Sequence, residues 1–240
     1  MSPSRFANDY VVPLWQPPAI PVSGGGLYPV RNIYCVGRNY AEHAREMGTD
    51  PDREPPFFFM KGADCITGSG TKIKYPPRTR NLHHEVELVC AIGAEGADIT
   101  VSNAQEYIFG YAVGVDLTRR DLQQSMKEKG RPWEIGKCFT QAAPIAELKP
   151  VSDVGHPREG EISLSVNGEV RQHGDLRDMI WSVDEVIAGY RNCFSWLWSI
   201  ASIVADSSSS GSFVWHNSGN WLGLVYYVFR MFVCVCIYNS

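Results

Sequence analysis

The sequence predicts a mainly β protein of the mixed α+β class, with short helices between its strands. Residues 83–92 and 107–116 alternate apolar side chains with polar or small ones, which is the period-two pattern of strands. Residues 162–172 contain two strand-like runs joined by Asn167-Gly168, a pair that favours the tight turn of a β-hairpin. The 240 residues suffice for one large domain or two small ones with a real core.

The first third of the chain alternates irregular segments with short elements. Residues 1–30 are rich in proline and glycine, lack the pattern of a signal or transit peptide, and are expected to be an irregular lead-in. Residues 31–37 predict a short strand ended by glycine, and residues 38–48 predict a short helix. The aromatic run before Lys61 predicts a buried strand, with the lysine either reaching solvent or facing a pocket.

The second half of the chain carries two clearer helix signals. Residues 117–130 are expected to form a polar helix, and residues 131–139 a turn followed by an apolar approach to a lysine. Ser182 and Glu185 have the spacing of a capping box, which predicts a helix over about residues 183–190.

Composition and charge narrow the range of partners and compartments. The formal net charge is −4 and no long basic run is present, which argues against a nucleic-acid-binding surface. The seven cysteines are scattered and form neither a C-x-x-C metal pair nor a disulfide framework. The sequence therefore predicts a reducing compartment, and the expected location is the cytoplasm.

Three acidic side chains mark the candidate site. Glu85 and Glu87 point to the same face of the strand predicted over residues 83–92, and Asp116 lies among small residues on the second strand. Like charges at this spacing repel, and burying them without a cation is costly. A divalent cation would remove that cost, and three carboxylates suit Mg²⁺ or Mn²⁺. The alternative is that the glutamates lie on the solvated face of a half-exposed sheet.

Other polar residues have spacings that fit either a site or a surface. His43 and Glu46 are three residues apart on the predicted helix, so the pair could orient a water molecule and take its proton. Alternatively, the pair lies on the solvent-facing side of a short surface helix. The same two interpretations apply to four further side chains, Lys61, Arg120, Gln123 and Lys137.

Several motifs occur in a fixed order and together resemble a known family. They are a run over residues 33–46, Phe-Phe-Met-Lys61, His84-Glu-Val-Glu-Leu88, a run over residues 110–121, Trp133-Glu-Ile-Gly-Lys137 and the Val-Asn-Gly-Glu hairpin. Across residues 25–192, the sequence resembles the fumarylacetoacetate hydrolase family. The most similar branch is that of the single-domain acylpyruvate and fumarylpyruvate hydrolases.

The resemblance implies a fold, a metal and an activity. It implies a strongly curved β-roll, usually dimeric, that binds Mg²⁺ or Mn²⁺ through Glu85, Glu87 and Asp116. The implied activity is metal-dependent cleavage of a C–C bond in a 2,4-diketo acid such as fumarylpyruvate, a small anionic substrate. Oxaloacetate decarboxylation and keto–enol isomerisation are adjacent outcomes for the same site.

The resemblance also implies roles for the remaining site residues. Catalytic roles fall to His43 and Glu46, which would activate a water molecule, and to Lys137, which would lie where negative charge develops. The substrate-binding positions are Lys61, Arg120 and Gln123.

The resemblance ends at about Cys193, so we expect a catalytic domain over residues 31–193 and an atypical tail over residues 194–240. The tail is apolar and serine-rich, with Asp206 and Arg230 as its charged residues. This composition favours a translated intron or a shifted reading frame.

Two other interpretations of the tail stay open. In a membrane tail, residues 221–238 would just reach spanning length, although Arg230 would cost about 2.5–3.5 kcal/mol. In a native variant, the apolar strands would pair into the edge of the sheet. The tail makes the family's homodimer doubtful here, and it adds a second functional hypothesis, a catalytically impaired member of the family.

Overall fold

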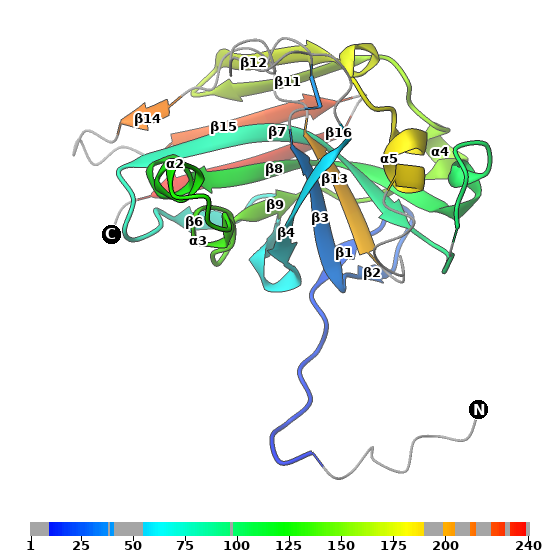
Figure 1. Ribbon diagram of the computed structural model, residues 1–240, viewed down its shortest axis with the longest axis horizontal. Helices are drawn as coiled ribbons and strands as arrows, with labels where there is room; N and C mark the ends of the chain where they lie inside the picture. Colours follow the sequence, from blue (N-terminus) through cyan, green and yellow to red (C-terminus); the bar gives the residue numbers. More distant parts are fainter. Residues whose placement is uncertain are drawn as a thin grey trace.

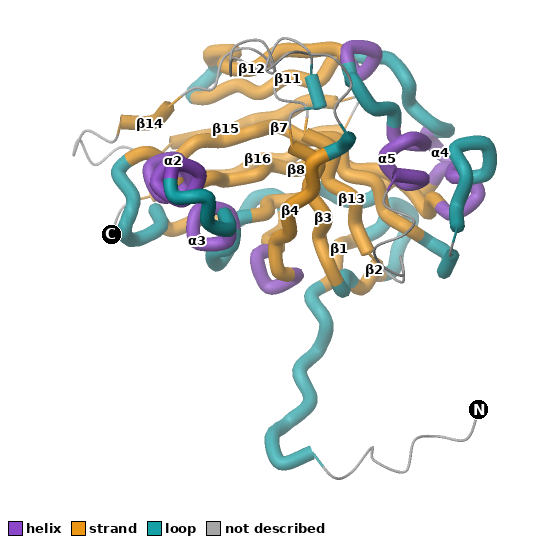
Figure 2. The backbone as a smooth tube through the Cα atoms, viewed as in Figure 1, coloured by secondary structure: helices purple, strands orange, loops and turns teal. Residues whose placement is uncertain are grey.

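The computed structural model describes residues 10–37, 39–40, 55–96 and 98–189, together with the backbone of four later strands. Strands dominate the architecture and short helices lie at its rim (Figures 1 and 2), which confirms the predicted fold class. The helices are α2 (Arg120–Glu128), α3 (Glu134–Lys137), α4 (Val151–Val154) and α5 (Val183–Gly189), with 3-10 turns η1 (Ala63–Cys65), η2 (Ala104–Tyr107) and η3 (Leu176–Asp178).

The larger sheet holds the two longest strands. Its members are β3 (Asn32–Gly37), β4 (Phe57–Gly62), β5 (Ile66–Gly68), β7 (Asn81–Ile92), β8 (Ile108–Arg119), β9 (Ala143–Ile145), β10 (Lys149–Pro150), β13 (Ser199–Val204) and β14 (Ser212–Val214). Their order is β4-β3-β13-β7-β8-β9-β5, with β10 beside β8 and β14 beside β7. Strands β7 and β8 curve through the middle of the molecule, as Figure 1 shows.

A smaller sheet and a ribbon complete the fold. The sheet contains β6 (Lys72–Lys74), β11 (Glu161–Val166), β12 (Glu169–Asp175), β15 (Leu222–Val228) and β16 (Met231–Tyr238), in the order β12-β11-β15-β16-β6. The ribbon pairs β1 (Ala19–Pro21) with β2 (Leu27–Pro29). The prediction that residues 1–30 are irregular is therefore wrong for the ribbon, where Ile20 and Tyr28 are buried in the core.

Strands β7 and β8 pair in antiparallel register from Leu82 opposite Arg119 to Ala91 opposite Gly110. Nearly every residue of both strands is buried, whichever face its side chain points to. In β7, the even-numbered apolar side chains belong to the hydrophobic core, and the odd-numbered side chains from residue 83 onward, on the other face, are buried as well. Strands buried on both faces hold their side chains in fixed positions, which suits a site built on this pair.

The hairpin and the capping box confirm two local predictions. Strands β11 and β12 flank Asn167 and Gly168, whose φ angles of 52° and 86° are both positive, as a type I′ turn requires. At the start of α5, the Ser182 N–H donates to Glu185 Oε2 at 3.0 Å, and the Glu185 N–H donates to Ser182 Oγ at 3.3 Å. These reciprocal bonds satisfy N–H groups that a helix start leaves unpaired.

Two predicted elements differ from the structure. Strand β8 continues to Arg119, so the helix predicted over residues 117–130 begins only at Arg120, because Leu117 and Thr118 pair with β7. Strand β4 lies in the expected place, but its aromatic residues are exposed or half-buried whereas Lys61 is buried. Most of the helix predicted over residues 38–48 lies outside the described part of the chain, because residues 41–54 are not described.

The backbone of the tail adds strands to both sheets. Strand β13 lies between β3 and β7, parallel to the former and antiparallel to the latter, rather than at a sheet edge. Strand β15 pairs with β11 and β16, and β16 also pairs with β6. Within the described ranges, no helix has the length and apolar character needed to cross a membrane. The domain boundary at residue 193 stays a prediction.

Candidate metal centre

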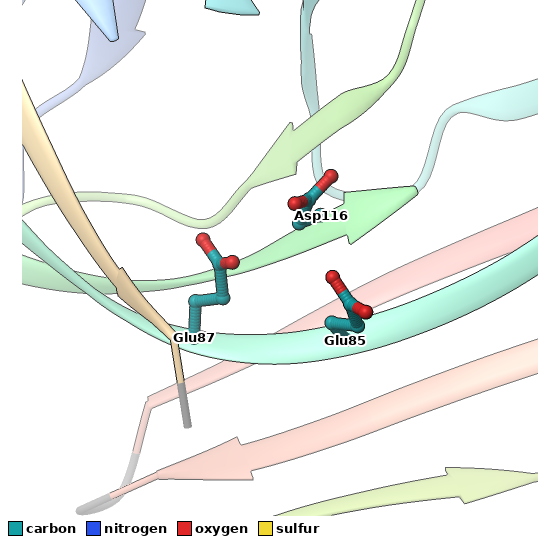
Figure 3. A group of neighbouring side chains, drawn as sticks. All are labelled: Glu85, Glu87 and Asp116. Carbon is teal, nitrogen blue, oxygen red and sulfur yellow. The ribbon is translucent and has the colours of Figure 1, made fainter. Parts of the chain in front are cut away.

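The three predicted acidic residues converge at the middle of the β7–β8 pair. Glu85 lies directly opposite Asp116 in the strand register, and Glu87 lies opposite Gly114. Their carboxylates reach the same place from the two strands (Figure 3), and one oxygen of each lies within 4.8 Å of the others. Glu85 is 3% exposed, and Glu87 and Asp116 are each 1% exposed. The alternative of a solvated strand face is therefore wrong.

Lys137 binds two of these carboxylates. Its Nζ lies 2.7 Å from Glu85 Oε2, 2.6 Å from Asp116 Oδ2 and 2.8 Å from Thr118 Oγ1. The lysine stands at the end of α3, which can lie close to α2 because residue 136 is glycine. A Cβ at Gly136 would lie 2.9 Å from the backbone nitrogen of Gln123, closer than carbon normally approaches.

Lys61 contacts the same group of acids from β4. Its Nζ lies 2.7 Å from Asp116 Oδ1 and donates to the backbone oxygens of Leu117, at 3.1 Å, and Lys137. The lysine is 1% exposed. The alternative in which Lys61 reaches solvent is therefore wrong, and its ammonium faces the buried acids instead.

Arg120 and Gln123 reach the acids from the first turn of α2. The Arg120 guanidinium donates to Glu85 Oε1 and, through its other terminal nitrogen, to Gln123 Oε1 at 2.5 Å. The Arg120 side chain is 22% exposed, whereas those of the two lysines are nearly inaccessible. Arg120 therefore lies on the side of the acids that solvent reaches.

Charge compensation is uneven among the three carboxylates. Burial disfavours the charge of Glu85, but Arg120 and Lys137 outweigh burial and hold its pKa well below the usual range. For Glu87, burial and then repulsion by Asp116 raise the pKa well above the usual range. Burial also disfavours the charge of Lys137, which Asp116 and Glu85 outweigh, so its pKa is raised. An added cation would therefore stabilise the charged form of Glu87.

The donor set fits a divalent, oxygen-preferring metal ion. Three buried carboxylates converge on one place, and a doubly charged ion would offset the repulsion that raises the pKa of Glu87. Carboxylate oxygens are ligands for Mg²⁺ and Mn²⁺ alike, so this chemistry does not choose between the two ions.

The structure brings together seven of the nine predicted site residues. They are Lys61, Glu85, Glu87, Asp116, Arg120, Gln123 and Lys137. The other two, His43 and Glu46, lie outside the described residues. The roles assigned to all nine stay predictions.

Thr118 is a site residue that the sequence analysis missed. Its hydroxyl accepts from Lys137 and lies 3.4 Å from both Glu85 Oε2 and Asp116 Oδ1. The available signal was its spacing of two residues from Asp116, which places both side chains on one face of a strand.

Two buried histidines next to the acids were also missed. Burial lowers the pKa of both His83 and His84 to about 4, so both imidazoles are neutral near pH 7. His83 shares the face of β7 that carries Glu85, and Thr118 lies opposite it in the register. Gln172, also buried, accepts a hydrogen bond at 3.0 Å from the backbone N–H of Val86.

Comparison with known proteins places this geometry among related enzymes. Residues 32–195 match the family model described as fumarylacetoacetate (FAA) hydrolase, C-terminal. The human protein named oxaloacetate tautomerase FAHD1, mitochondrial, is 40% identical over 158 residues, which are 66% of this chain and 71% of that protein. The fumarylpyruvate hydrolase of Ralstonia sp is 42% identical over 144 residues, 59% of this chain and 74% of that protein.

The fold of this chain is also similar to that of solved structures. The fumarylpyruvate hydrolase of Pseudomonas aeruginosa, crystallised in complex with Mn²⁺ and pyruvate, matches with a TM-score of 0.87 and 42% sequence identity. The match covers 97% of this chain and 100% of that one. The likeness in fold therefore extends into the tail strands, beyond residue 195 where the family match in sequence ends.

Proposed function

Because this chain belongs to the fumarylacetoacetate hydrolase family, we propose that it is a divalent-metal-dependent enzyme that cleaves a C–C bond of a 2,4-diketo acid of the fumarylpyruvate type. One observation carries the proposal: Glu85, Glu87 and Asp116 converge while buried, with an arginine and two lysines around them. The Pseudomonas relative, crystallised with Mn²⁺ and pyruvate, supports both the type of ion and a keto acid as ligand.

In this proposal, the three acids hold Mg²⁺ or Mn²⁺. When bound, the ion would supply Lewis-acid stabilisation of the negative charge that develops on the keto acid's oxygens as the C–C bond breaks. Thr118 and the two lysines already contact Glu85 and Asp116, and these contacts restrict the rotation of the carboxylates. A preorganised set of ligands binds an ion with little reorganisation.

Arg120 and Gln123 are the proposed substrate-binding pair. The arginine is the more exposed of the cations around the acids, and its hydrogen bond to Gln123 orients the guanidinium. A guanidinium suits recognition of a carboxylate, which every 2,4-diketo acid carries. Lys61, the third proposed substrate contact, would add positive charge behind the acids.

Lys137 and the pair of His43 and Glu46 have the proposed catalytic roles. The ammonium of Lys137 is fixed by three oxygen atoms, so it could stabilise developing negative charge without reorienting. His43, oriented by Glu46, would take a proton from the water that attacks the 4-carbonyl.

The test is turnover of fumarylpyruvate by the purified chain with added Mg²⁺ or Mn²⁺. Loss of the enol absorbance together with release of pyruvate is the expected result. Glu87→Gln, which keeps the side-chain shape, should reduce turnover by at least 100-fold, whereas Glu169→Gln, at an exposed strand position, should leave it unchanged. Full activity of Glu87→Gln, or wild-type turnover that is unaffected by a chelator, would overturn the proposal.

A second activity, keto–enol tautomerisation of oxaloacetate, is favoured by the human relative's name. It would need the same ion and cations but no attack by water, because a proton moves between carbon and oxygen and no C–C bond breaks. Comparing fumarylpyruvate cleavage with oxaloacetate enol loss, on equal amounts of protein, would separate the two activities. Metal binding without either activity would favour a catalytically impaired family member.

We also propose a cytoplasmic location, and the family's homodimer stays an expectation that the tail makes doubtful here. The location follows from the reducing compartment that the scattered cysteines indicate, although the human relative is named as mitochondrial. Fractionation of the source cells tests the location, and light scattering of the purified chain tests the dimer.

A further inference from the structure

A row of side chains on β4 leads from the metal centre to solvent. Alternate side chains of a strand share a face, so Phe57 and Phe59 point to the same side as Lys61, whose ammonium binds Asp116. Exposure rises along this face with distance from the acids. Lys61 is 1% exposed, Phe59 is half-buried, and Phe57 is 43% exposed.

Trp133 joins this row from the residue before α3, a helix that lies beside β4 (Figure 1). Its ring centroid lies 4.9 Å from that of Phe57 and 6.0 Å from that of Phe59. The centroids of the two phenylalanine rings are 6.4 Å apart. The three rings therefore contact one another at the spacings usual for aromatic pairs. We call Phe57, Phe59 and Trp133 the aromatic surface.

The aromatic surface begins at the metal centre. The Lys137 Nζ lies 4.8 Å from the centroid of the Phe59 ring, and the same ammonium binds two of the three acids. A ligand group that leaves the acids next to Lys137 would meet Phe59 first, and Phe57 and Trp133 nearer to solvent.

The outer two rings are not needed to fill the interior. Within the described part of the chain, Phe57 and Trp133 lie outside the hydrophobic core and partly face solvent. The Phe57 ring packs on the opposite residue of β3, Gly37, where an added Cβ would lie 2.8 Å from Phe57 Cδ1. Aromatic side chains that are fixed in position and exposed next to a few buried charged groups are typical of a small-molecule binding site.

We propose that the aromatic surface binds the hydrocarbon part of the substrate's acyl group, so that the enzyme prefers acylpyruvates with longer or conjugated acyl groups. This inference rests on the proposed function and specifies the part of the substrate that the proposed function leaves open. The acids and the cations around them would bind the keto-acid end, which all acylpyruvates share. The aromatic surface would contact the end that varies, which in fumarylpyruvate is flat and conjugated and suits contact with rings.

The first test compares kcat/KM for acetylpyruvate and hexanoylpyruvate with added Mg²⁺ or Mn²⁺. The two substrates share the keto-acid end and differ in the length of the alkyl chain. Fully burying one methylene favours binding about four-fold, and contact along one side of the chain favours it about two-fold. The longer acyl group should therefore raise kcat/KM by about ten-fold or more.

Substitutions in the aromatic surface should remove this preference. Trp133→Ala and Phe57→Ala should each lower the ratio of the two kcat/KM values to about three or less, whereas Trp133→Phe should keep most of it. Trp133→Ala preserves the start of α3, because the Gly136 and Lys137 N–H groups donate to the backbone carbonyl of residue 133. Trp15→Ala is the matched control, because Trp15 is 71% exposed on the N-terminal segment, and it should keep the wild-type ratio.

A binding measurement separates this inference from the proposed function. Calorimetry with Mg²⁺ compares pyruvate with 2-oxooctanoate, which lacks the 4-carbonyl and is not cleaved, so the comparison needs no turnover. The wild type should bind 2-oxooctanoate about ten-fold more tightly or better, and Trp133→Ala should lose most of this difference. If the difference holds although fumarylpyruvate is not cleaved, the proposed function fails and the aromatic surface stands.

Three results would overturn the inference. They are equal affinities of the wild type for the two 2-oxo acids, binding of neither acid, and a wild-type difference that persists in both Trp133→Ala and Phe57→Ala. Light scattering identifies a different occupant. Loss of a dimer in Trp133→Ala with an unchanged preference for the longer chain would assign the aromatic surface to contact with a second copy of this chain.

Discussion

Replacing Lys137 with methionine removes a buried ammonium while keeping most of the side-chain volume. The Lys137 Nζ lies 2.7 Å from Glu85 Oε2 and 2.6 Å from Asp116 Oδ2, and the residue is 2% exposed. Removing one partner of a buried ion pair leaves the other charge uncompensated, which costs about 3–5 kcal/mol. We expect metal-free Lys137→Met to lose about this much free energy of unfolding.

Urea denaturation in the presence of a chelator, followed by circular dichroism, measures this loss. Lys127→Met is the matched control, because Lys127 is an exposed lysine on α2, and it should change the free energy of unfolding by less than about 0.5 kcal/mol. A loss below about 1 kcal/mol in Lys137→Met, or equal losses in the two variants, would refute the conclusion that this ammonium compensates the buried acids.

Three other substitutions test individual contacts, two of them close to the site and one at the start of α5. Gly136→Ala puts a Cβ 2.9 Å from the Gln123 nitrogen and should cost about 1–3 kcal/mol in a thermal melt. His84 resists protonation when folded, with its pKa lowered by burial from 6.5 to about 4, so stability should fall by about 2–3 kcal/mol as pH drops from 6.5 to 4. His84→Asn should remove this contribution in urea titrations, whereas the contribution of His83, whose pKa is also lowered to about 4, should remain. Ser182→Ala removes the cap opposite Glu185 and should cost about 1 kcal/mol by the same titration. Wild-type behaviour in any of these variants would contradict the corresponding contact.

Local pattern was enough to predict the elements that carry the acids. The alternation in β7 and β8 depends on a strand's period of two, so the sequence indicated that Glu85 and Glu87 share a face. The Asn167-Gly168 turn and the capping box of α5 likewise depend on residues close together in the chain. The extra strand length at Leu117 was missed because pairing with β7, a distant segment, outweighs local helix preference there.

Among the site residues, too, the contacts between distant segments could not be predicted from local pattern. Lys61 and Lys137 are 76 residues apart in the sequence, yet the ammonium of one donates to the carbonyl of the other. The family resemblance implied that both belong to one site, but their spacing does not. Thr118 was not found from the sequence, since a single threonine carries no pattern of its own.

The sequence alone determined that Glu85 and Glu87 share one face of a strand and that Asp116 lies on a second strand, because side-chain direction in a strand is set by residues next to one another. The pairing that brings Asp116 opposite Glu85 joins distant segments. Only the tertiary structure decided that these acids are buried, that Lys61 and Lys137 neutralise Glu85 and Asp116, and that β13 enters the sheet between β3 and β7. Burial and charge pairing depend on contacts between distant segments, which form together when the chain folds.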